Sequence, residues 1–146
     1  MELTPQLVQD HKSFEAFRAL LQSSNLPYAD LNYKDHILVG YYENHELIGT
    51  GGLEVYDGYA LLRSLAVKMG VRGLSIGSFI TKDLIEQARK KKLKGIYLLT
   101  ETAHGFFQLK GFKDVDRKSV PDVVKSSTEF SHVCPTTAAC MFLDLS

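Results

Sequence analysis

The order of hydrophobic and polar residues predicts a chain in which short strands alternate with two longer helices. Apolar residues at three- and four-residue spacing are typical of a helix with one buried face, and they recur after Asp10 and again from Leu74 to Ala88. Short apolar runs bounded by glycine or polar turns are typical of strands. These runs are residues 36–42, 46–55, 61–67 and 95–100.

Turn residues fix the directions of these strands. Glu43-Asn44-His45 and Tyr56-Asp57-Gly58 predict two hairpin turns, so three consecutive strands should be antiparallel. The helix near Leu74 then crosses over to the strand at 95–100, which should run parallel to the strand before the helix. Pro5 indicates a short first edge strand at residues 2–9. The sequence therefore predicts an α+β fold with a mixed, mostly antiparallel sheet flanked by helices.

Smaller elements follow from local signals. Asp10 is a suitable N-cap for the first helix, and Ser23-Ser24-Asn25 should end it. Residues 26–31 form either a loop or a short second helix. A further short helix is expected at residues 103–110, before Gly111.

Length and charge narrow the possible functions. The chain has 146 residues and no linker, so we expect one domain over residues 1–146. Lysine plus arginine and aspartate plus glutamate both number 17, which argues against a nucleic-acid-binding surface. No apolar run approaches the roughly 20 residues of a membrane span, and the first residues show no export signal. We expect a cytoplasmic protein, a monomer or homodimer, that acts on a small molecule and contacts neither nucleic acid nor membrane.

Cys134 and Cys140 are the only cysteines. Without an export signal we expect reduced thiols, and a single pair with five residues between them lacks the spacing of a zinc site. We therefore predict small buried side chains and no metal site.

The segment after the strand at 61–67 has the composition of an anion-binding loop. It reads Val71-Arg72-Gly73-Leu74-Ser75-Ile76-Gly77-Ser78. Small residues let the backbone approach a ligand closely, and the first turn of a helix has amide groups without partners inside the helix. Such a helix start favours a phosphate group.

This strand, loop and helix resemble the acetyl-CoA arm of the GNAT N-acetyltransferase superfamily. In that loop an Arg or Gln is followed by two residues, Gly, one residue, and Gly or Ala. Arg72, Ser75 and Gly77 occupy these positions, with serine in place of the usual first glycine. The resemblance implies the GNAT acyl-CoA N-acyltransferase fold, with splayed fourth and fifth strands, and acetyl-CoA as co-substrate. The implied cofactor contacts are the main chain at Leu65, Ala66 and Val67, the residues Arg72, Gly73, Leu74, Ser75, Ile76, Gly77 and Ser78, and also Thr102 and Phe107.

A second stretch resembles the helix after the sheet in the same superfamily. Leu99-Thr100-Glu101-Thr102-Ala103 is followed by Phe106-Phe107 and Gly111-Phe112. Many members have tyrosine at the position of Phe107, and that tyrosine often protonates the departing CoA thiolate. Phe107 cannot donate a proton, so the thiolate must obtain one elsewhere or leave unassisted.

The C-terminal tail is similar to the arsenic-resistance-type N-acetyltransferases, a GNAT branch related to amino-acid N-acetyltransferases. The residues concerned are Asp116–Pro121, Glu129-Phe130-Ser131, Cys134-Pro135 and Ala138–Leu143, together with Gly52-Leu53-Glu54 and Leu61–Ser64. The resemblance covers nearly the whole chain from about Ile48 onward.

Acetyl transfer to an amine requires a base for the ammonium and donors for the oxyanion that develops. Some GNAT members have a glutamate base at the position of Leu61, which cannot accept a proton. The carboxylates left nearby are Glu54 and Glu101. Glu54 is either the base, acting directly or through a water, or the cross-strand ion-pair partner of Arg63.

Arg63 interrupts an apolar strand, and an unpaired buried charge is costly, so it requires an anion. A carboxylate of the acceptor would supply a bidentate partner. Ser64, a third catalytic candidate, and Thr100 should add hydrogen bonds, unless backbone groups satisfy their hydroxyls. Tyr28 and Tyr33 lie in a region that overhangs the acceptor pocket in the GNAT fold, so they either touch substrate or pack at the edge of the core.

These features predict an N-acetyltransferase that moves acetyl from acetyl-CoA directly to the primary amine of a small molecule, such as an amino acid or an analogue. One alternative is a protein N-terminal or lysine acetyltransferase, which an acidic groove would favour, but the sequence has no acidic run. The other is a CoA-binding regulatory module without turnover, which Leu61 and Phe107 at two usual catalytic positions would explain.

Overall fold

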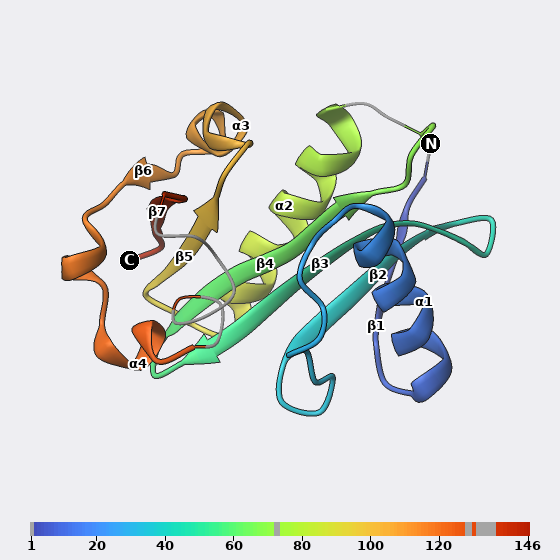
Figure 1. Cartoon of the computed structure of the whole chain (residues 1–146), viewed down its shortest axis with the longest axis horizontal. Helices are drawn as coiled ribbons and strands as arrows, with labels where there is room; N and C mark the ends of the chain where they lie inside the picture. The colour runs from blue at the N-terminus through green and yellow to red at the C-terminus, as the bar shows by residue number, and fades with distance from the viewer. Residues whose placement is uncertain (1, 72–73, 128–129, 131–136) are drawn as a thin grey trace. The chain divides into compact units, whose positions relative to one another are not determined.

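The computed structural model describes residues 2–71, 74–127, 130 and 137–146, without the side chain of Leu74. In these residues the strands form one mixed sheet in the order β1-β2-β3-β4-β5-β7-β6 (Figure 1). The elements are β1 (Thr4–Leu7), α1 (His11–Ser23), β2 (Ile37–Glu43), β3 (Glu46–Tyr56), β4 (Tyr59–Val67), α2 (Leu74–Lys90), β5 (Gly95–Thr100), α3 (His104–Leu109), β6 (Lys113–Asp114), the 3₁₀ turn η1 (Arg117–Ser119), α4 (Asp122–Lys125) and β7 (Ala139–Asp144).

The chain divides into two compact units. The first consists of Met1–Glu54 and Leu62–Ile85, and the second of Val55–Leu61 and Glu86–Ser146. Strands β3 and β4 and helix α2 contribute residues to both units, so each unit is described by itself below.

In the first unit, β1, β2 and β3 pair antiparallel, and α1 and α2 lie on opposite faces of the sheet (Figure 1). On one face, Phe17 and Leu21 of α1 share a buried cluster with Leu38 of β2. On the other face, the backbone at Gly51 of β3 lies so close to α2 that an added Cβ would stand 2.7 Å from the Leu84 side chain. Glycine at this position therefore permits α2 to pack directly on the strand.

Both predicted hairpin turns are confirmed. Asn44 and His45 have φ values of 50° and 68°, and Asp57 and Gly58 have values of 52° and 93°. Two consecutive residues with positive φ form the turn whose twist matches that of the two strands it joins. The turns thereby fix the order β2-β3-β4.

The second unit contains the parallel pair. Strand β5 pairs with the start of β4 from Tyr59↔Gly95 to Leu61↔Tyr97, and β7 pairs antiparallel with both β5 and β6. Strand β4 continues to Val67, but its ladder with β5 ends at Leu61. The predicted parallel pairing of these two strands is therefore confirmed over the start of β4.

The local signals at the helix ends are also confirmed. The Asp10 carboxylate accepts a hydrogen bond from the Ser13 amide at 2.8 Å, and this bond and a second one from the Ser13 hydroxyl hold the pKa of Asp10 below its usual value. Residues 26–31 form a loop with turns, not a helix. Helix α3 ends before Gly111, whose φ is 98°.

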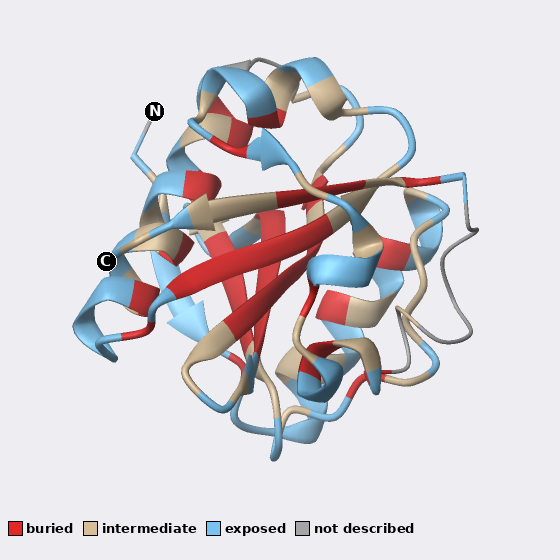
Figure 2. Ribbon diagram, turned by 90° about the vertical axis from the view of Figure 1, so that its left-hand side faces the viewer, coloured by how far each residue is buried: buried red, intermediate tan, exposed pale blue. Residues whose placement is uncertain are grey.

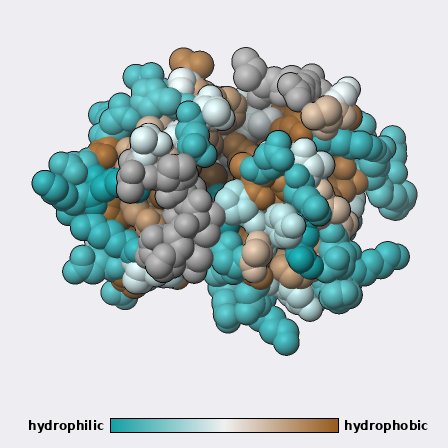
Figure 3. Space-filling model, in the orientation of Figure 1, coloured by the Kyte–Doolittle hydropathy of each residue, from teal (hydrophilic) through white to brown (hydrophobic). Residues whose placement is uncertain are grey.

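Burial follows the predicted apolar pattern. The strands that cross the middle of Figure 2 are largely buried, whereas the outward sides of the helices are exposed. The outward side of α1 is hydrophilic in Figure 3. Within the described ranges, none of the helices has both the length and the apolar character that a membrane crossing requires.

Candidate active site

Arg63 of β4 is the centre of a buried charged cluster in the first unit. Its Nη1 atom donates to Glu54 Oε2 at 2.9 Å and to Asp30 Oδ2 at 2.5 Å, while Nη2 donates to Asp30 Oδ1 at 3.0 Å. The side chains of Arg63 and Glu54 are only 2% and 3% exposed. Nη2 also approaches the carbonyl of Pro27 at 3.5 Å. We call Asp30, His36, Glu54 and Arg63 the Arg63 cluster.

The anion that neutralises Arg63 differs from the predicted one. A carboxylate of the acceptor was expected to neutralise this guanidinium, but Asp30 and Glu54 of the protein itself already do so. The alternative assignment of Glu54, as the cross-strand partner of Arg63, is confirmed. Asp30 was not predicted, because it lies 33 residues from Arg63 in a loop without any periodic signal.

Burial and pairing act in opposite directions on Asp30. Burial alone would raise the pKa of its carboxyl group, but the hydrogen bonds and the charge of Arg63 outweigh burial and hold the pKa below its usual value. Asp30 is therefore ionised at neutral pH.

His36 lies beside Glu54 with a defined orientation. Its Nε2 atom is 3.8 Å from Glu54 Oε2, and its Nδ1 atom accepts a hydrogen bond from the Asn32 amide at 3.3 Å. Because Nδ1 accepts, the proton of the neutral ring is on Nε2, the nitrogen nearer to Glu54. With neutral His36, the two carboxylates and one guanidinium leave the Arg63 cluster with one net negative charge. A cluster with this charge attracts a cationic group such as an ammonium.

Ser64, next to Arg63, has two unfavourable features. Its φ is 64°, in the left-handed region that serine rarely adopts, and its Oγ atom is buried without a hydrogen-bond partner in the described part of the chain. A buried unsatisfied hydroxyl costs about 1–3 kcal/mol, and a strained backbone of this kind costs about as much. Thr50 of β3 donates to the Ser64 carbonyl at 2.7 Å, which holds this backbone in place. The expected alternative, that backbone groups satisfy the Ser64 hydroxyl, is not observed.

The predicted phosphate site is described only in part. Arg72 and Gly73 lie outside the described residues, as does the side chain of Leu74. Helix α2 begins at Leu74 and has no acidic residue in its first turn. Ser75 is exposed, Ser78 is half-buried, and Ile76 and Gly77 are buried. The amide groups of this first turn lack partners inside the helix and suit an anion.

The end of β4, where the sequence predicts main-chain contacts with acetyl-CoA, suits such contacts. Ala66 is buried, whereas Leu65 and Val67 are half-buried. Among the described residues, the segment 62–67 forms no ladder with β5, which leaves one edge of β4 without a strand partner. The orphaned Ser64 hydroxyl, this open strand edge and the start of α2 together fit a polar, extended ligand such as acetyl-CoA.

Four predicted site residues belong to the second unit. The Thr100 hydroxyl accepts a hydrogen bond at 3.0 Å from the amide of Ala103, the residue before α3, and Glu101 and Thr102 are exposed. Phe107 is 5% exposed, with its ring 5.1 Å from that of Phe106 and 5.6 Å from that of Phe112. The Phe107 ring is therefore part of the core, and a cofactor contact by this residue stays a prediction.

Tyr28 and Tyr33 pack against the buried cluster beneath α1. The Arg18 guanidinium stands 5.4 Å from the centre of the Tyr28 ring, and the Tyr33 ring is 5.1 Å from that of Phe14. These contacts support the core-packing alternative for both tyrosines. A substrate contact by Tyr28 stays a prediction.

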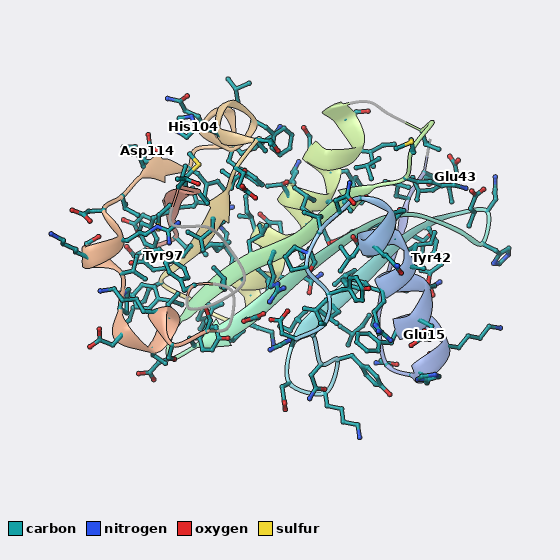
Figure 4. All side chains as sticks on the ribbon, viewed as in Figure 1. Glu15, Tyr42, Glu43, Tyr97, His104 and Asp114 are labelled. Atoms are coloured by element: carbon teal, nitrogen blue, oxygen red, sulfur yellow. The ribbon has the colours of Figure 1, made fainter. Side chains whose placement is uncertain are left out.

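Cys140 and His104 lie in surroundings that indicate structural roles. Cys140 is a free, buried cysteine on β7, and burial raises the pKa of its thiol, so it is protonated and not nucleophilic at neutral pH. Cys134 and His132 lie outside the described residues. His104 Nε2 lies 2.7 Å from Asp114 Oδ1 in an exposed pair between α3 and β6 (Figure 4). Over the ranges that the structure covers, no group of three or more His, Cys, Asp and Glu side chains is placed to hold a metal ion.

Solved structures share this fold along the whole chain. N-acetylglutamate synthase from Neisseria gonorrhoeae, solved with coenzyme A and N-acetyl-glutamate, has a TM-score of 0.81 at 14% identity over 100% of this chain and 36% of that chain. This chain therefore spans about a third of the synthase. A Mycobacterium tuberculosis protein solved with CoA and a second ligand has a TM-score of 0.75 at 22% identity, over 97% of this chain and 99% of that one. Ribosomal-protein alanine N-acetyltransferase from Escherichia coli has a TM-score of 0.73 at 16% identity, over 99% and 95% of the two chains.

Identities this low show the fold alone, but the sequence itself carries a family signal. The model of the acetyltransferase (GNAT) family matches residues 5–112, which is most of the chain and includes β4, the start of α2 and the Arg63 cluster. The chain belongs to the GNAT family of acetyltransferases, and its co-substrate is acetyl-CoA.

Proposed function

We propose that this protein, acting as a single domain, transfers acetyl from acetyl-CoA directly to the primary amine of a small molecule, with amino acids and their analogues as the acceptor class. The observation that carries the proposal is the open edge of β4 from Leu62 to Val67, where the ladder with β5 has ended. Bound acetyl-CoA supplies the acetyl group as an activated thioester. The main chain at Leu65 and Val67 offers hydrogen bonds along this edge, and the start of α2 offers amides to phosphate oxygens.

The Arg63 cluster supplies the acceptor side of the proposal. Its net negative charge favours an incoming ammonium, and Glu54 is the carboxylate that we assign as base. Arg63 and Asp30 are positioning residues, because they hold the Glu54 carboxylate and the loop that carries Asp30 in place. His36 directs its protonated Nε2 atom to Glu54 Oε2 at 3.8 Å, so it cannot accept a proton from Glu54 there and is a further positioning residue.

The acceptor class rests on two considerations. The balanced charge of the chain and its lack of an acidic run favour a small amine over a basic protein segment. The tail resembles the arsenic-resistance-type branch, which is related to amino-acid N-acetyltransferases. Both N-acetylglutamate synthase and the ribosomal-protein enzyme have this fold, so an acceptor screen must include amino acids, their phosphinic and arsinic analogues, and short peptides.

The first prediction tests acetyl transfer to an amine and the assignment of Glu54 as the base in one experiment. Release of free CoA thiol from acetyl-CoA should depend on an amine in the screen, and Glu54→Gln should lower this turnover by roughly 10²- to 10⁴-fold and remove the acidic limb of its pH profile. Glu46→Gln is the matched control, because Glu46 is an exposed glutamate on the same strand that pairs with Lys68. It should leave turnover unchanged.

Two results would contradict the proposal. Binding of acetyl-CoA without turnover of any amine would favour a CoA-binding regulatory module. Near-normal turnover by a folded Glu54→Gln variant would leave Glu54 as a structural partner of Arg63 only, with Glu101 or solvent as the base.

A further inference from the structure

Ser64 carries a buried hydroxyl that the protein's own residues do not explain. It is 8% exposed, and no group in the described part of the chain accepts or donates a hydrogen bond at its Oγ atom. The other small buried hydroxyls described in the first unit do have partners: Thr50 donates to the Ser64 carbonyl, and Thr81 donates to the Gly77 carbonyl at 2.8 Å. Buried polar groups are almost always hydrogen-bonded, so an exception requires a reason.

The backbone at Ser64 gives a second, independent observation. A φ of 64° strains the backbone of a serine because of its Cβ atom, whereas glycine would adopt this conformation without strain. A residue that is both strained and unsatisfied is typical of a functional site, where a ligand supplies the missing contact.

The position of Ser64 indicates which ligand this is. The residue lies in the segment of β4 whose one edge has no strand partner, directly after Arg63 of the charged cluster. Ser64 therefore belongs to the main-chain edge assigned to acetyl-CoA and follows, by one position, the arginine that binds the carboxylate assigned to the amine. The group that lies at this junction in an acetyl transfer is the acetyl carbonyl.

We propose that the Ser64 hydroxyl is a catalytic hydrogen-bond donor to the carbonyl oxygen of the bound acetyl group, which rests on the proposed function above. As the amine nitrogen bonds to the carbonyl carbon, negative charge grows on that oxygen, and the Ser64 hydrogen bond strengthens. Before this attack the ammonium gives one proton to Glu54, which releases it to solvent, so the nitrogen attacks as the free amine. The carbon–sulfur bond then breaks, and the departing thiolate takes the second proton that the nitrogen loses, which gives the amide and the CoA thiol. Ser64 keeps its own proton throughout.

Ser64→Ala tests this assignment with three measurements. Turnover should fall by about 10²-fold, the effect of removing one donor to a developing oxyanion. Affinity for acetyl-CoA, measured by calorimetry, should fall a few-fold while affinity for CoA, which has no acetyl group, stays unchanged. The urea midpoint should stay the same or rise, since the variant removes an unsatisfied buried hydroxyl.

Two further variants make the test robust. Ser64→Gly also lacks the hydroxyl but relieves the backbone strain, so it should show the same loss of turnover with higher stability, and it serves if Ser64→Ala fails to fold. Ser127→Ala removes a buried hydroxyl that does have a partner, the Phe130 amide at 3.3 Å, and should lower stability without changing turnover.

Unchanged turnover in both Ser64 variants would overturn the inference, as would an equal loss of affinity for acetyl-CoA and CoA. A lower urea midpoint for Ser64→Ala would overturn it too, because the hydroxyl would then have a structural partner. If the wild-type protein turned over no amine, the proposed function would fail, while the acetyl-CoA and CoA affinities would still decide the role of Ser64.

Discussion

Leu61 and Arg63 lie two positions apart on β4 and are buried to a similar degree, yet their surroundings are opposite in character. Leu61 packs in the second unit with Tyr97, Val120, Val124 and Cys140, a cluster that is apolar except for the tyrosine hydroxyl and the thiol. Arg63 lies in the first unit among carboxylates. An apolar cluster gains stability from burial itself, whereas a buried ion cluster gains little once the loss of hydration is counted. Because burial of these charges adds little stability, a role in chemistry would account for the cluster, and we therefore propose the acceptor site at Arg63.

The largest effect should come from removing the charge that holds the Arg63 cluster together. Arg63→Ala leaves Asp30 and Glu54 buried without their shared partner, and loss of one member of a buried ion pair costs about 3–5 kcal/mol. Urea unfolding at pH 7 measures this loss. It should shrink as the pH approaches 4, because burial without Arg63 raises the pKa of Asp30 and its uncompensated charge is then removed by protonation.

Adding Glu54→Gln to Arg63→Ala should restore part of the lost stability, since one uncompensated charge is removed. If Arg63→Ala lost less than about 1 kcal/mol at pH 7, the contribution expected of an exposed ion pair, Arg63 would not be stabilising a buried cluster.

Leu61→Ala should cost somewhat less, and its cost should not depend on pH. The side chain is fully buried, and leucine-to-alanine substitutions in a core cost about 2–5 kcal/mol through lost burial and the cavity that remains. The same urea series from pH 4 to pH 7 tests this prediction. A cost that changed with pH as it does for Arg63→Ala would mean that the two clusters are coupled.

The sequence predicted most of the fold because its signals are local. The strand at 95–100 and the hairpin turns were placed correctly from apolar runs and turn residues, and Asp10 was recognised as a cap from its position before the first helix. Arg63 was also recognised as a buried charge that requires an anion. What could not be predicted was the identity of that anion, since Asp30 reaches Arg63 only through tertiary folding.

The strain at Ser64 was equally hidden. Positive φ in a strand is usually accompanied by glycine or asparagine in the sequence, and a serine within an apolar run gives no such signal. The core role of Phe107 was missed for a related reason, because its likeness to a catalytic position said nothing about the two phenylalanine rings that enclose it. In both cases the missing information was the three-dimensional environment, not the residue type.

The smallest effect is expected at the rim of the Arg63 cluster. Asp30 has a pKa below its usual value, because the stabilising contacts with Arg63 outweigh its burial. A carboxyl group whose folded-state pKa is depressed contributes stability above its unfolded pKa of about 3.8, and this contribution is lost as the pH falls through the folded-state value.

Asp30→Asn should therefore lower the free energy of unfolding at pH 7 by about 1.5–3 kcal/mol, the usual contribution of hydrogen bonds to a charged group. Urea titrations from pH 7 down to pH 3 should show the wild-type and variant curves beginning to converge as the pH falls below 3.8, because the contribution of Asp30 is lost between its unfolded pKa and its lower folded-state pKa. Asp10→Asn is the matched control, since asparagine caps a helix about as well as aspartate, and its effect at pH 7 should be smaller. A constant difference between wild type and Asp30→Asn across the whole pH range would show that the Asp30 side chain stabilises the loop by packing and not by its charge.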